Sequence, residues 1–436
     1  MQIYYSLDEQ MVSFMSLERL KKEMVDMGEF GRDPPRRVEC RADLDPEKGV
    51  TRPCGTDANK KALDYVVARM EEAGLNVKVD KVGNIYGRLD GKIDKGAIWA
   101  GSHVDSVVNG GQFDGTLGVM TALEATRRLI EEGHETYRPI EVVVYTGEEG
   151  SAFPLALLGS STLIGKVTYE QALAAKNRNG EVLEDVLDRM GYKGNFERKL
   201  EDVDYSLELH VEQGPVLDAE SIPVGIVENI TGLAWILATI EGEENHAGTT
   251  PMKMRKDALL AASEIVSLVN KNALDLLNKY GGSTVGTVGR FDVFPGAPNI
   301  VPGRVEVGID VRDVVEKNLN FMIDEAKKAL KSLEKKYGVS VSMEMPFGVH
   351  KAAPLSPEVV DTIEKSAKEV NVTARRMNSG AGHDSQNIAE KIKTGMIFVP
   401  SIKGISHAPM EWTEWEDIEE GTKVLTQTLK NLSMKK

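Results

Sequence analysis

The sequence predicts an α/β fold with a doubly wound, mostly parallel sheet that carries a second, inserted domain. Strand-like and helix-like segments alternate in the first part of the chain, as in sheets built from parallel strands. In residues 231–345 the strand-like and helix-like segments follow a different order, and the alternation resumes from residue 346. With 436 residues the chain is also long for one domain, so two domains are the default expectation.

The first domain is expected to comprise residues 1–230 and 346–436. In its first clear helix, Leu63, Val66 and Met70 recur at helical spacing on one face. A continuous β-branched run, IEVVVY, is typical of a central strand that is covered on both faces. The expected elements are a helix at 56–74, a hairpin over 75–89, a buried strand at 97–100, a helix ending at 133, a strand at 140–145, a helix near 357–370 and a strand at 396–400.

The inserted segment predicts a ferredoxin-like domain. Its strand and helix patterns follow the order β-α-β-β-α-β, which is the order of that fold. The strands are expected in AWILATIEG, STVGTVGRFDV, RVEVGIDVR and VSVSMEM, and two long amphipathic helices are expected between them.

Composition and charge exclude several classes of function. Asp and Glu number 68 against 53 Lys and Arg, and the net charge of −15 disfavours nucleic acid and anionic membranes as partners. No apolar run approaches the roughly 20 residues that span a bilayer, and the N-terminus does not read as a secretory signal. Two cysteines in a chain of this length favour a reducing cytoplasm over a disulfide scaffold.

The loop after the strand at 97–100 is unusual, since GSHVDSVVNGGQFDGTLGV combines His103, Asp105 and Asp114 with many glycines. One interpretation is a glycine-rich phosphate cradle. However, the loop has no Gly-Lys-Ser/Thr ending and no G-x-G-x-x-G spacing, and two aspartates would repel a phosphate. The other interpretation is a metal site in which the glycines only fold the loop.

Further potential ligands follow other strands, namely Glu148 and Glu149 in TGEEG, His210 in ELHVEQGP and His407 in GISHAPME. In an open α/β sheet such residues meet at the carboxyl ends of the strands. Mixed histidine and carboxylate ligands suit zinc, manganese, cobalt or nickel rather than calcium. Each signal alone is weak, because a histidine after a strand is often structural and a Glu-Glu pair is often solvated. Their joint occurrence favours a metal hydrolase.

The ordered motifs resemble those of the amidase, hydantoinase and carbamoylase family of binuclear metal hydrolases in the metallopeptidase superfamily. This family includes N-carbamoyl-L-amino acid hydrolases, allantoate amidohydrolases and β-ureidopropionases. The resemblance covers about residues 45–420. It rests on GSHVDSVVNGGQFDGTLGV, EEGSAF, ELHVEQGP, HAGTTPM, PNIVPG, DVRD, GAGHDS and GISHAPMEW.

The resemblance implies two divalent metal ions per subunit and a role for each ligand. Asp114 would bridge the ions, His103 and His210 would complete one site, and Glu149 and His407 would complete the other. Glu148 would be the general base, and Asp105 would orient His103.

The resemblance also implies substrate-binding residues, which are Gln213, His246, Asn299, Arg312, Gly380, Ala381, Gly382 and His383. His246 would stabilise the oxyanion, and Arg312 would bind the substrate carboxylate. The inserted domain would act as a lid and form a homodimer interface. Without the family, an ion pair with Asp310 or Asp313 is the simpler role for Arg312, and a structural role is an equal alternative for His383.

We therefore expect a cytoplasmic amidohydrolase that cleaves the carbamoyl C–N bond of N-carbamoyl-L-amino acids or related small anionic ureido acids. Gly147 and Met410 replace acids that are common in relatives, which puts the substrate rather than the metal site in question. The alternatives are an allantoate amidohydrolase, an aminoacylase or dipeptidase-like amide hydrolase, and a catalytically silent metal-binding protein. The silent protein is disfavoured because all five ligands and the base are present.

Overall fold

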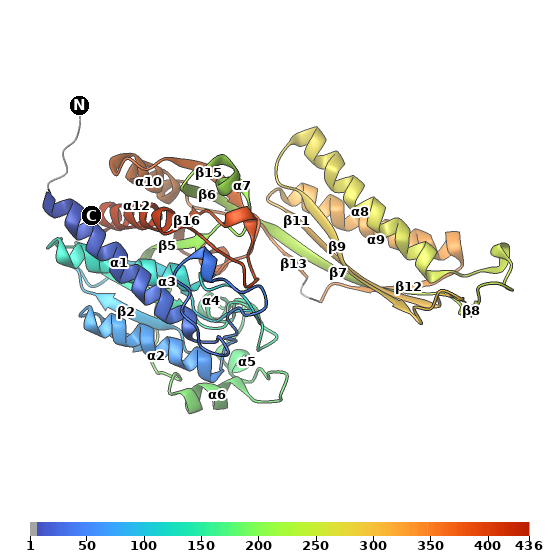
Figure 1. Ribbon diagram of the computed structural model, residues 1–436, viewed down its shortest axis with the longest axis horizontal. Helices are drawn as coiled ribbons and strands as arrows, with labels where there is room; N and C mark the ends of the chain where they lie inside the picture. Colours follow the sequence, from blue (N-terminus) through green and yellow to red (C-terminus); the bar gives the residue numbers. More distant parts are fainter. Residues whose placement is uncertain (1–6, 347, 436) are drawn as a thin grey trace. The chain divides into compact units, whose positions relative to one another are not determined.

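The computed structural model describes residues 7–346 and 348–435, with side chains described from residue 15 onward, and divides into two compact units (Figure 1). Unit 1 comprises Met1–Glu228, Pro354–Ser379 and His383–Lys436. Unit 2 comprises Asn229–Ala353 and Gly380–Gly382. Unit 2 thus extends beyond residue 345, because the short strand β13 (Val349–His350) pairs with strand β7 (Gly232–Glu241) of the unit 2 sheet.

Unit 1 contains a nine-stranded sheet in the order β1-β2-β4-β3-β5-β16-β6-β14, with β15 beside β6. Its centre, β4-β3-β5-β16, is parallel, whereas β1, β2 and β6 pair antiparallel at its flanks. The predicted parallel sheet in an α/β unit is therefore confirmed. The strands are β1 (Asn76–Val79), β2 (Ile85–Leu89), β3 (Ala97–His103), β4 (Ile140–Tyr145), β5 (Val203–Val211), β6 (Val224–Ile230), β14 (Ala353–Pro354), β15 (Ala374–Ser379) and β16 (Lys393–Val399).

Helices cover both faces of this sheet. Trp99 and Ser102 are three residues apart in β3, so they point to opposite faces. Trp99 packs in a buried cluster with Ile388 of α11, whereas Ser102 lies against Gly118 of α3. The helices of unit 1 are α1 (Leu7–Glu29), α2 (Asp57–Glu72), α3 (Thr116–Glu131), α4 (Leu158–Leu163), α5 (Tyr169–Leu173), α6 (Leu183–Met190), α7 (Val216–Glu220), α10 (Pro357–Glu369), α11 (Asp384–Ile388) and α12 (Trp415–Ser433).

Helix α2 illustrates how local sequence forms these elements. The Thr56 side chain caps it by accepting a hydrogen bond from the Asn59 N–H. The predicted stripe of Leu63, Val66 and Met70 is buried. The chain then leaves the helix through Gly74, whose φ of +81° favours glycine. None of the helices in the described residues is long and apolar enough to cross a membrane.

Unit 2 contains a separate antiparallel sheet in the order β12-β7-β11-β9, with β13 beside β7. Every second residue of β7 is buried in an apolar core together with α8 and α9. The residues between them point to the opposite, outer face of the sheet. The elements are β7 (Gly232–Glu241), α8 (Ala258–Tyr280), β9 (Val285–Phe294), β11 (Arg304–Asp313), α9 (Glu316–Tyr337) and β12 (Ser340–Glu344), with β8 (Asn245–His246) and β10 (Ile300–Val301) as a separate pair.

Candidate metal centre

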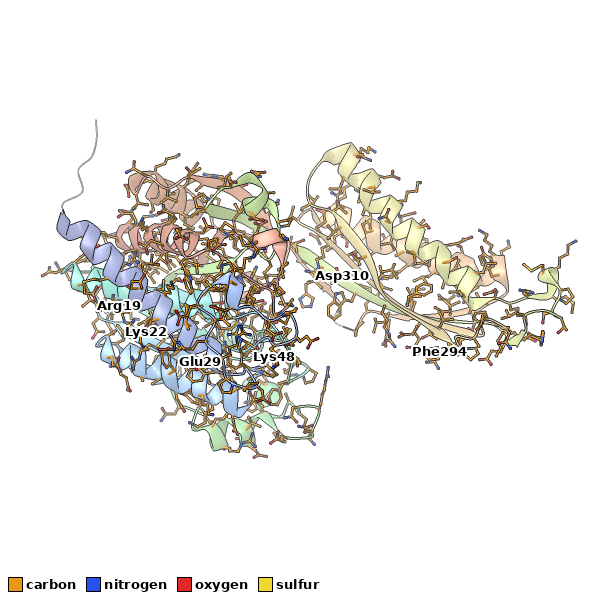
Figure 2. The ribbon with its side chains drawn as sticks, in the orientation of Figure 1. Arg19, Lys22, Glu29, Lys48, Phe294 and Asp310 are labelled. Atoms are coloured by element: carbon orange, nitrogen blue, oxygen red, sulfur yellow. The ribbon has the colours of Figure 1, made fainter. Side chains whose placement is uncertain are left out.

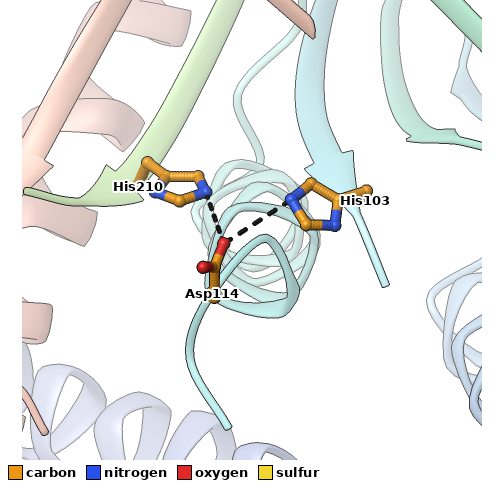
Figure 3. Close-up of side chains that lie close together, drawn as sticks. All are labelled: His103, Asp114 and His210. Atoms are coloured by element: carbon orange, nitrogen blue, oxygen red, sulfur yellow. Dashed lines mark ion pairs between the residues drawn. The ribbon is translucent and has the colours of Figure 1, made fainter. Parts of the chain in front are cut away.

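Three buried side chains meet at the ends of two neighbouring parallel strands. His103 is the last residue of β3, His210 lies next to the end of β5, and Asp114 lies in the loop that enters α3 (Figure 3). Nε2 of His103 lies 3.7 Å and Nε2 of His210 lies 3.3 Å from Oδ1 of Asp114. Adjacent parallel strands thus bring two imidazoles to one carboxylate oxygen.

The other oxygen of Asp114 belongs to a second group. Nε2 of His407 lies 3.1 Å from Oδ2 of Asp114 and 3.6 Å from Oε2 of Glu149. Within each group, the potential ligand atoms lie within 4.8 Å of one another. The five residues predicted as metal ligands therefore form two groups that share Asp114.

The imidazoles are oriented for binding through Nε2. Nδ1 of His103 lies 3.0 Å from the carbonyl oxygen of Asp105, and Nδ1 of His210 lies 2.9 Å from that of Val211. A carbonyl partner places the proton on Nδ1, so the lone pair on Nε2 can form a ligand bond. In this structure Nε2 of His210 accepts the Gly115 N–H at 3.1 Å. Hydrogen bonding to Asp114 raises the pKa of His210 to about 9, although burial opposes this shift.

The donor set fits divalent metal ions. Oε1 of Glu149 is buried and has no hydrogen-bond partner among the described residues, which suits a carboxylate that faces an ion. Nitrogen and oxygen donors in this mixture suit zinc and similar divalent ions. Without such ions, burial and the neighbouring carboxylates Asp114 and Asp105 raise the pKa of Glu149 well above its usual range.

Glycines of the loop allow this close approach. Gly115 has a φ of +64°, and a Cβ there would lie 2.2 Å from a ring carbon of His103. A Cβ on Gly111 would lie 2.0 Å from Oε1 of Glu411. Because contacts below 3.0 Å essentially never occur, neither position accepts a side chain without a shift of its surroundings. The loop glycines thus make room for His103 and for a buried carboxylate.

Glu148 lies beside the first group, with Oε2 3.8 Å from Nε2 of His103. Its backbone N–H and that of Glu149 donate to the Asp105 carboxylate at 3.2 and 3.3 Å. Asp105 thus holds the Glu148–Glu149 turn with its side chain and His103 with its carbonyl group. Burial and the nearby carboxylates of Glu149 and Asp384 raise the pKa of Glu148 well above its usual range. A carboxylate in this position is suited to the transfer of protons to and from a reacting group.

Glu411 is a buried residue beside the candidate site that the sequence interpretation did not single out. Its Oε1 accepts the N–H groups of Phe113 and Asp114, both at 3.1 Å, and its Oε2 accepts the Ser406 hydroxyl at 2.8 Å. It therefore links the loop of Asp114 to the loop of His407. Burial, together with the charge of Asp114, raises the pKa of Glu411 to about 7. The available signal was an acid four residues after His407.

Arg52 is a second missed residue, and it is fully buried. Its Nε donates to the Val104 carbonyl at 2.6 Å, and its Nη2 donates to the Thr116 hydroxyl at 2.7 Å. Its Nη1 donates to the carbonyl oxygens of Met27 and Phe30 at the end of α1. Arg52 thus links the backbone before the loop that carries Asp114 to the Thr116 side chain after it.

Gln213 lies at the second group of potential ligands. Its Nε2 donates to Oδ2 of Asp114 at 2.9 Å and lies 3.4 Å from Nε2 of His407. Its backbone φ is +58° and that of His407 is +53°, a left-handed conformation that is uncommon outside glycine. Its Oε1 has no hydrogen-bond partner among the described side chains.

His383 lies behind the first group, and its ring centroid is 4.7 Å from that of His210. Its Nε2 lies 3.0 Å from the Ser379 hydroxyl. Burial, together with the charge of His210, lowers the pKa of His383 well below its usual range. Glu208 also approaches His210 and His383, but its two oxygens accept hydroxyl hydrogen bonds from Ser102 and Ser385.

The remaining predicted residues lie in unit 2. His246 is exposed, and its Nδ1 accepts the N–H groups of Gly248 at 2.9 Å and Thr249 at 3.2 Å. In the neutral imidazole, the proton is therefore on Nε2, where it can be donated. Asn299 is close to this loop in the fold, since its carbonyl accepts the Ala247 N–H at 3.0 Å.

Arg312 makes the ion pair that the sequence offered as its simpler role. Its Nε and Nη2 donate to the two oxygens of Asp310, both at 2.9 Å. Its Nη1 donates to the carbonyl oxygen of Gly380 at 2.9 Å. The pair of Asp310 and Arg312 thus places the guanidinium beside the glycine loop of Gly380, Ala381 and Gly382, in which carboxylate binding was predicted.

Comparison with known proteins identifies the family. Residues 96–431 match Peptidase family M20/M25/M40. The chain belongs to this family. It is 36% identical to an N-carbamoyl-L-amino-acid amidohydrolase of Paenarthrobacter aurescens, over 95% of this chain and 98% of the relative. It is 33% identical to an allantoate amidohydrolase of Escherichia coli, over 90% and 95% of the two chains.

Comparison with a solved structure also supports membership of this family. An amidase of the hydantoinase/carbamoylase family from Burkholderia multivorans superposes with a TM-score of 0.88 and is 35% identical. The match covers 96% of this chain and 98% of the other. The resemblance predicted from the eight motifs is therefore confirmed.

Proposed function

We propose that this family member is a metal-dependent amidohydrolase that cleaves the carbamoyl C–N bond of N-carbamoyl-L-amino acids or related ureido acids. The products would be the amino acid, CO2 and ammonia. The observation that carries this proposal is the carboxylate of Asp114, shared between two groups of histidine and carboxylate side chains with Glu148 beside them. The names of the relatives from Paenarthrobacter and Escherichia support the substrate class.

Two divalent ions, zinc, manganese, cobalt or nickel, would bind to these two groups. When bound, the ions would supply a nucleophile at neutral pH and polarise the substrate carbonyl. Glu148 would take the proton released by the attacking water and pass it to the leaving nitrogen. The hydrogen bonds that His103 donates to the Asp105 carbonyl and His210 donates to the Val211 carbonyl keep both imidazoles in the ligand tautomer.

The predicted substrate-binding residues are proposed to have the following roles. Gln213 would contact the carbamoyl group, and Nε2–H of His246, with Asn299, would stabilise the developing oxyanion. Arg312 would bind the substrate carboxylate together with backbone groups of residues 380–383. We further propose that unit 2 is a ferredoxin-like domain, which its β-α-β-β-α-β order supports. The family resemblance implies that this domain acts as a lid and forms the interface of a homodimer. A cytoplasmic location stays a prediction.

An ammonia-release assay tests this function. The metal-loaded protein is incubated with N-carbamoyl amino acids, ureidopropionate, allantoate and N-acetyl amino acids, each with zinc, manganese, cobalt or nickel. We expect ammonia from an N-carbamoyl amino acid. Preference for allantoate would favour the alternative indicated by the Escherichia relative. Cleavage of acetyl substrates without any ammonia from the others would contradict the proposal.

A further inference from the structure

The turn that carries Glu148 is held by its carbonyl groups as well as by the amide groups that bind Asp105. The carbonyl groups of three successive residues of this turn accept the N–H groups at the start of α4. The pairs are Thr146 with Gly159 at 2.8 Å, Gly147 with Leu158 at 3.3 Å and Glu148 with Leu157 at 2.8 Å. The position of α4 therefore sets where the backbone of Glu148 lies.

Helix α11 in turn holds the start of α4. The Ser160 hydroxyl donates to Oδ1 of Asp384 and accepts Nδ2–H of Asn387 at 3.0 Å. The three side chains of this contact are buried. Because Ser160 directly follows the residues that bind the turn, one hydroxyl group links α11 to the backbone of Glu148.

Helix α11 is itself fixed to the centre of the unit 1 sheet. The N–H and hydroxyl groups of Ser385 donate to Oε2 of Glu208 at 3.3 and 2.6 Å. Oε1 of Glu208 accepts the Ser102 hydroxyl at 2.7 Å. Glu208 lies on β5 and Ser102 on β3, the strands that carry His210 and His103. Buried hydrogen bonds thus connect these two strands, through α11 and α4, to the turn that carries the base.

We infer that Asp384 is a positioning residue for the base, an inference that rests on the role of Glu148 in the proposed function. Its Oδ1 fixes the Ser160 hydroxyl, and Ser160 keeps the start of α4 where its N–H groups hold the Glu148 backbone. Asp384 acts through this contact and sets the distance over which Glu148 transfers a proton. A misplacement of about 1 Å in a catalytic group can cost about 10²-fold in rate.

The second oxygen of Asp384 allows its hydrogen bond to be separated from its charge. Oδ2 is buried and has no hydrogen-bond partner among the described residues. Asp384→Asn keeps the Oδ1 acceptor and replaces Oδ2, so the charge is lost while the hydrogen bond to Ser160 is kept. Asp384→Ala removes both. The comparison is needed because the charge of Asp384, after burial and Glu149, also contributes to the raised pKa of Glu148.

The test is a double-mutant cycle that combines Asp384→Ala with Glu148→Gln. For the wild type, both single variants and the double variant, kcat and KM are measured with metal-loaded protein. The substrate is whichever of N-carbamoyl-L-leucine, ureidopropionate and allantoate the wild type cleaves fastest. Metal content is measured by mass spectrometry, and folding is checked by thermal unfolding.

Three further single variants accompany the cycle. Ser160→Ala removes the other partner of the hydrogen bond to Asp384. Thr162→Val is the matched control, since Thr162 is also buried in α4 but donates to the Leu158 carbonyl of the same helix at 2.8 Å. Lys22→Ala is a surface control, because Lys22 lies on α1 and pairs with Asp26 (Figure 2).

We expect Asp384→Ala and Ser160→Ala each to lower kcat by about 10–100-fold, with KM and metal content changed less than about twofold. Asp384→Asn should keep kcat within about threefold of wild type, because the hydrogen bond remains. Both control variants should behave as wild type. In the Glu148→Gln background, Asp384→Ala should lower kcat by no more than about twofold, since a base that is absent cannot be displaced.

Two results would overturn the inference. If Asp384→Ala lowers kcat by the same factor with and without Glu148→Gln, Asp384 acts on the fold or on the metal centre and not through the base. If Asp384→Asn loses as much activity as Asp384→Ala, the charge and not the hydrogen bond to Ser160 is the cause. Should Asp384→Ala not fold, Ser160→Ala takes its place in the cycle with the same expectation, and equal factors in the two backgrounds again overturn the inference.

The substrate range of the wild type separates this inference from the proposed function. If ureido acids are cleaved and the effects in the cycle are additive, the inference fails while the proposed function stands. If only N-acetyl amino acids are cleaved, the proposed function fails, and the same cycle on the acetyl substrate decides the inference. If no substrate is cleaved with any metal, both fail.

Discussion

The candidate metal centre of unit 1 and the face of the unit 2 sheet that carries Arg312 differ in burial but share a way of fixing side chains. His103, Asp114 and His210 are 2%, 6% and 1% exposed, whereas the Arg312 side chain is 28% exposed. In both regions a second residue orients the functional one, as Asp105 does for His103 and Asp310 does for Arg312. The first group of potential ligands is thus held within the core, whereas His407 of the second group, with 52% of its side chain exposed, and Arg312 lie nearer the surface.

The largest effect expected from the buried region is that of Glu148→Gln. Removal of the general base should lower kcat by about 10²–10⁴-fold, because the side chain no longer accepts a proton. The metal content should stay unchanged if the ions occupy the two groups that share Asp114, because Glu148 belongs to neither of them and only to a third group with His103 and Glu149. Steady-state kinetics with metal analysis by mass spectrometry checks both points. Turnover within a few-fold of wild type would remove Glu148 from the mechanism.

Arg312→Ala tests the exposed region. Loss of a charged hydrogen-bond donor should lower kcat/KM for N-carbamoyl amino acids by about 10–100-fold. The carboxamide of the same substrate should lose much less, because it carries no carboxylate. Arg304→Ala, on the same strand but paired with Glu306, serves as the control. Equal losses on the acid and the amide would contradict carboxylate binding by Arg312.

Substitution of Glu411, also in the buried region, is expected to have a smaller effect than that of Glu148. In Glu411→Ala the N–H groups of Phe113 and Asp114 lose their acceptor, so the affinity for metal should fall by about 10–100-fold. Glu411→Gln keeps an amide oxygen for these groups and should lose less. Competition with a coloured chelator measures both affinities. Wild-type affinity in Glu411→Ala would show that the loop holds its shape without this carboxylate.

The smallest effect is a pH dependence of the metal-free protein. The pKa is raised in the folded state to about 7 for Glu411 and to about 9 for His210, from ordinary values of 4.5 and 6.5. Between the ordinary and the raised pKa, each of these two groups binds more protons in the folded than in the unfolded chain, so its contribution to the free energy of unfolding falls as pH rises. With a chelator, Tm should drop by several degrees between about pH 5 and 9.

Divalent metal should remove this drop, because an ion replaces the protons among the carboxylates and imidazoles. Thermal unfolding across the pH range, with chelator and with each metal, provides the measurement. A Tm that rises with pH in chelator would contradict the raised pKa values of Glu411 and His210.

The residues at the strand ends could be predicted because their signals are local. A β-branched or apolar run followed by a histidine or an acid identifies His103, Glu149 and His210 within a few positions of the sequence. The helix stripe of α2 is equally local. Parallel pairing then brings the strand ends to one edge of the sheet, and the family motifs add the roles.

Glu411 and Arg52 could not be predicted in the same way. Glu411 meets the Asp114 N–H across 297 positions of the chain, and no periodic pattern encodes such a contact. Arg52 is charged and fully buried, which sequence rules disfavour until its carbonyl partners are known. Short helices α4, α5 and α6 were also missed, since helices of this length depend on tertiary packing more than on propensity.

The left-handed backbone of Gln213 and His407 has a consequence for evolution and engineering. Each conformation costs a non-glycine residue on the order of 1–2 kcal/mol, whereas glycine adopts it freely. Gln213→Gly and His407→Gly would relieve this backbone cost, but they would also remove the hydrogen bond and the ion pair to Asp114. The cost of the backbone at these two positions is thus tied to side chains that contact Asp114, so a stabilised variant should be selected for activity at the same time.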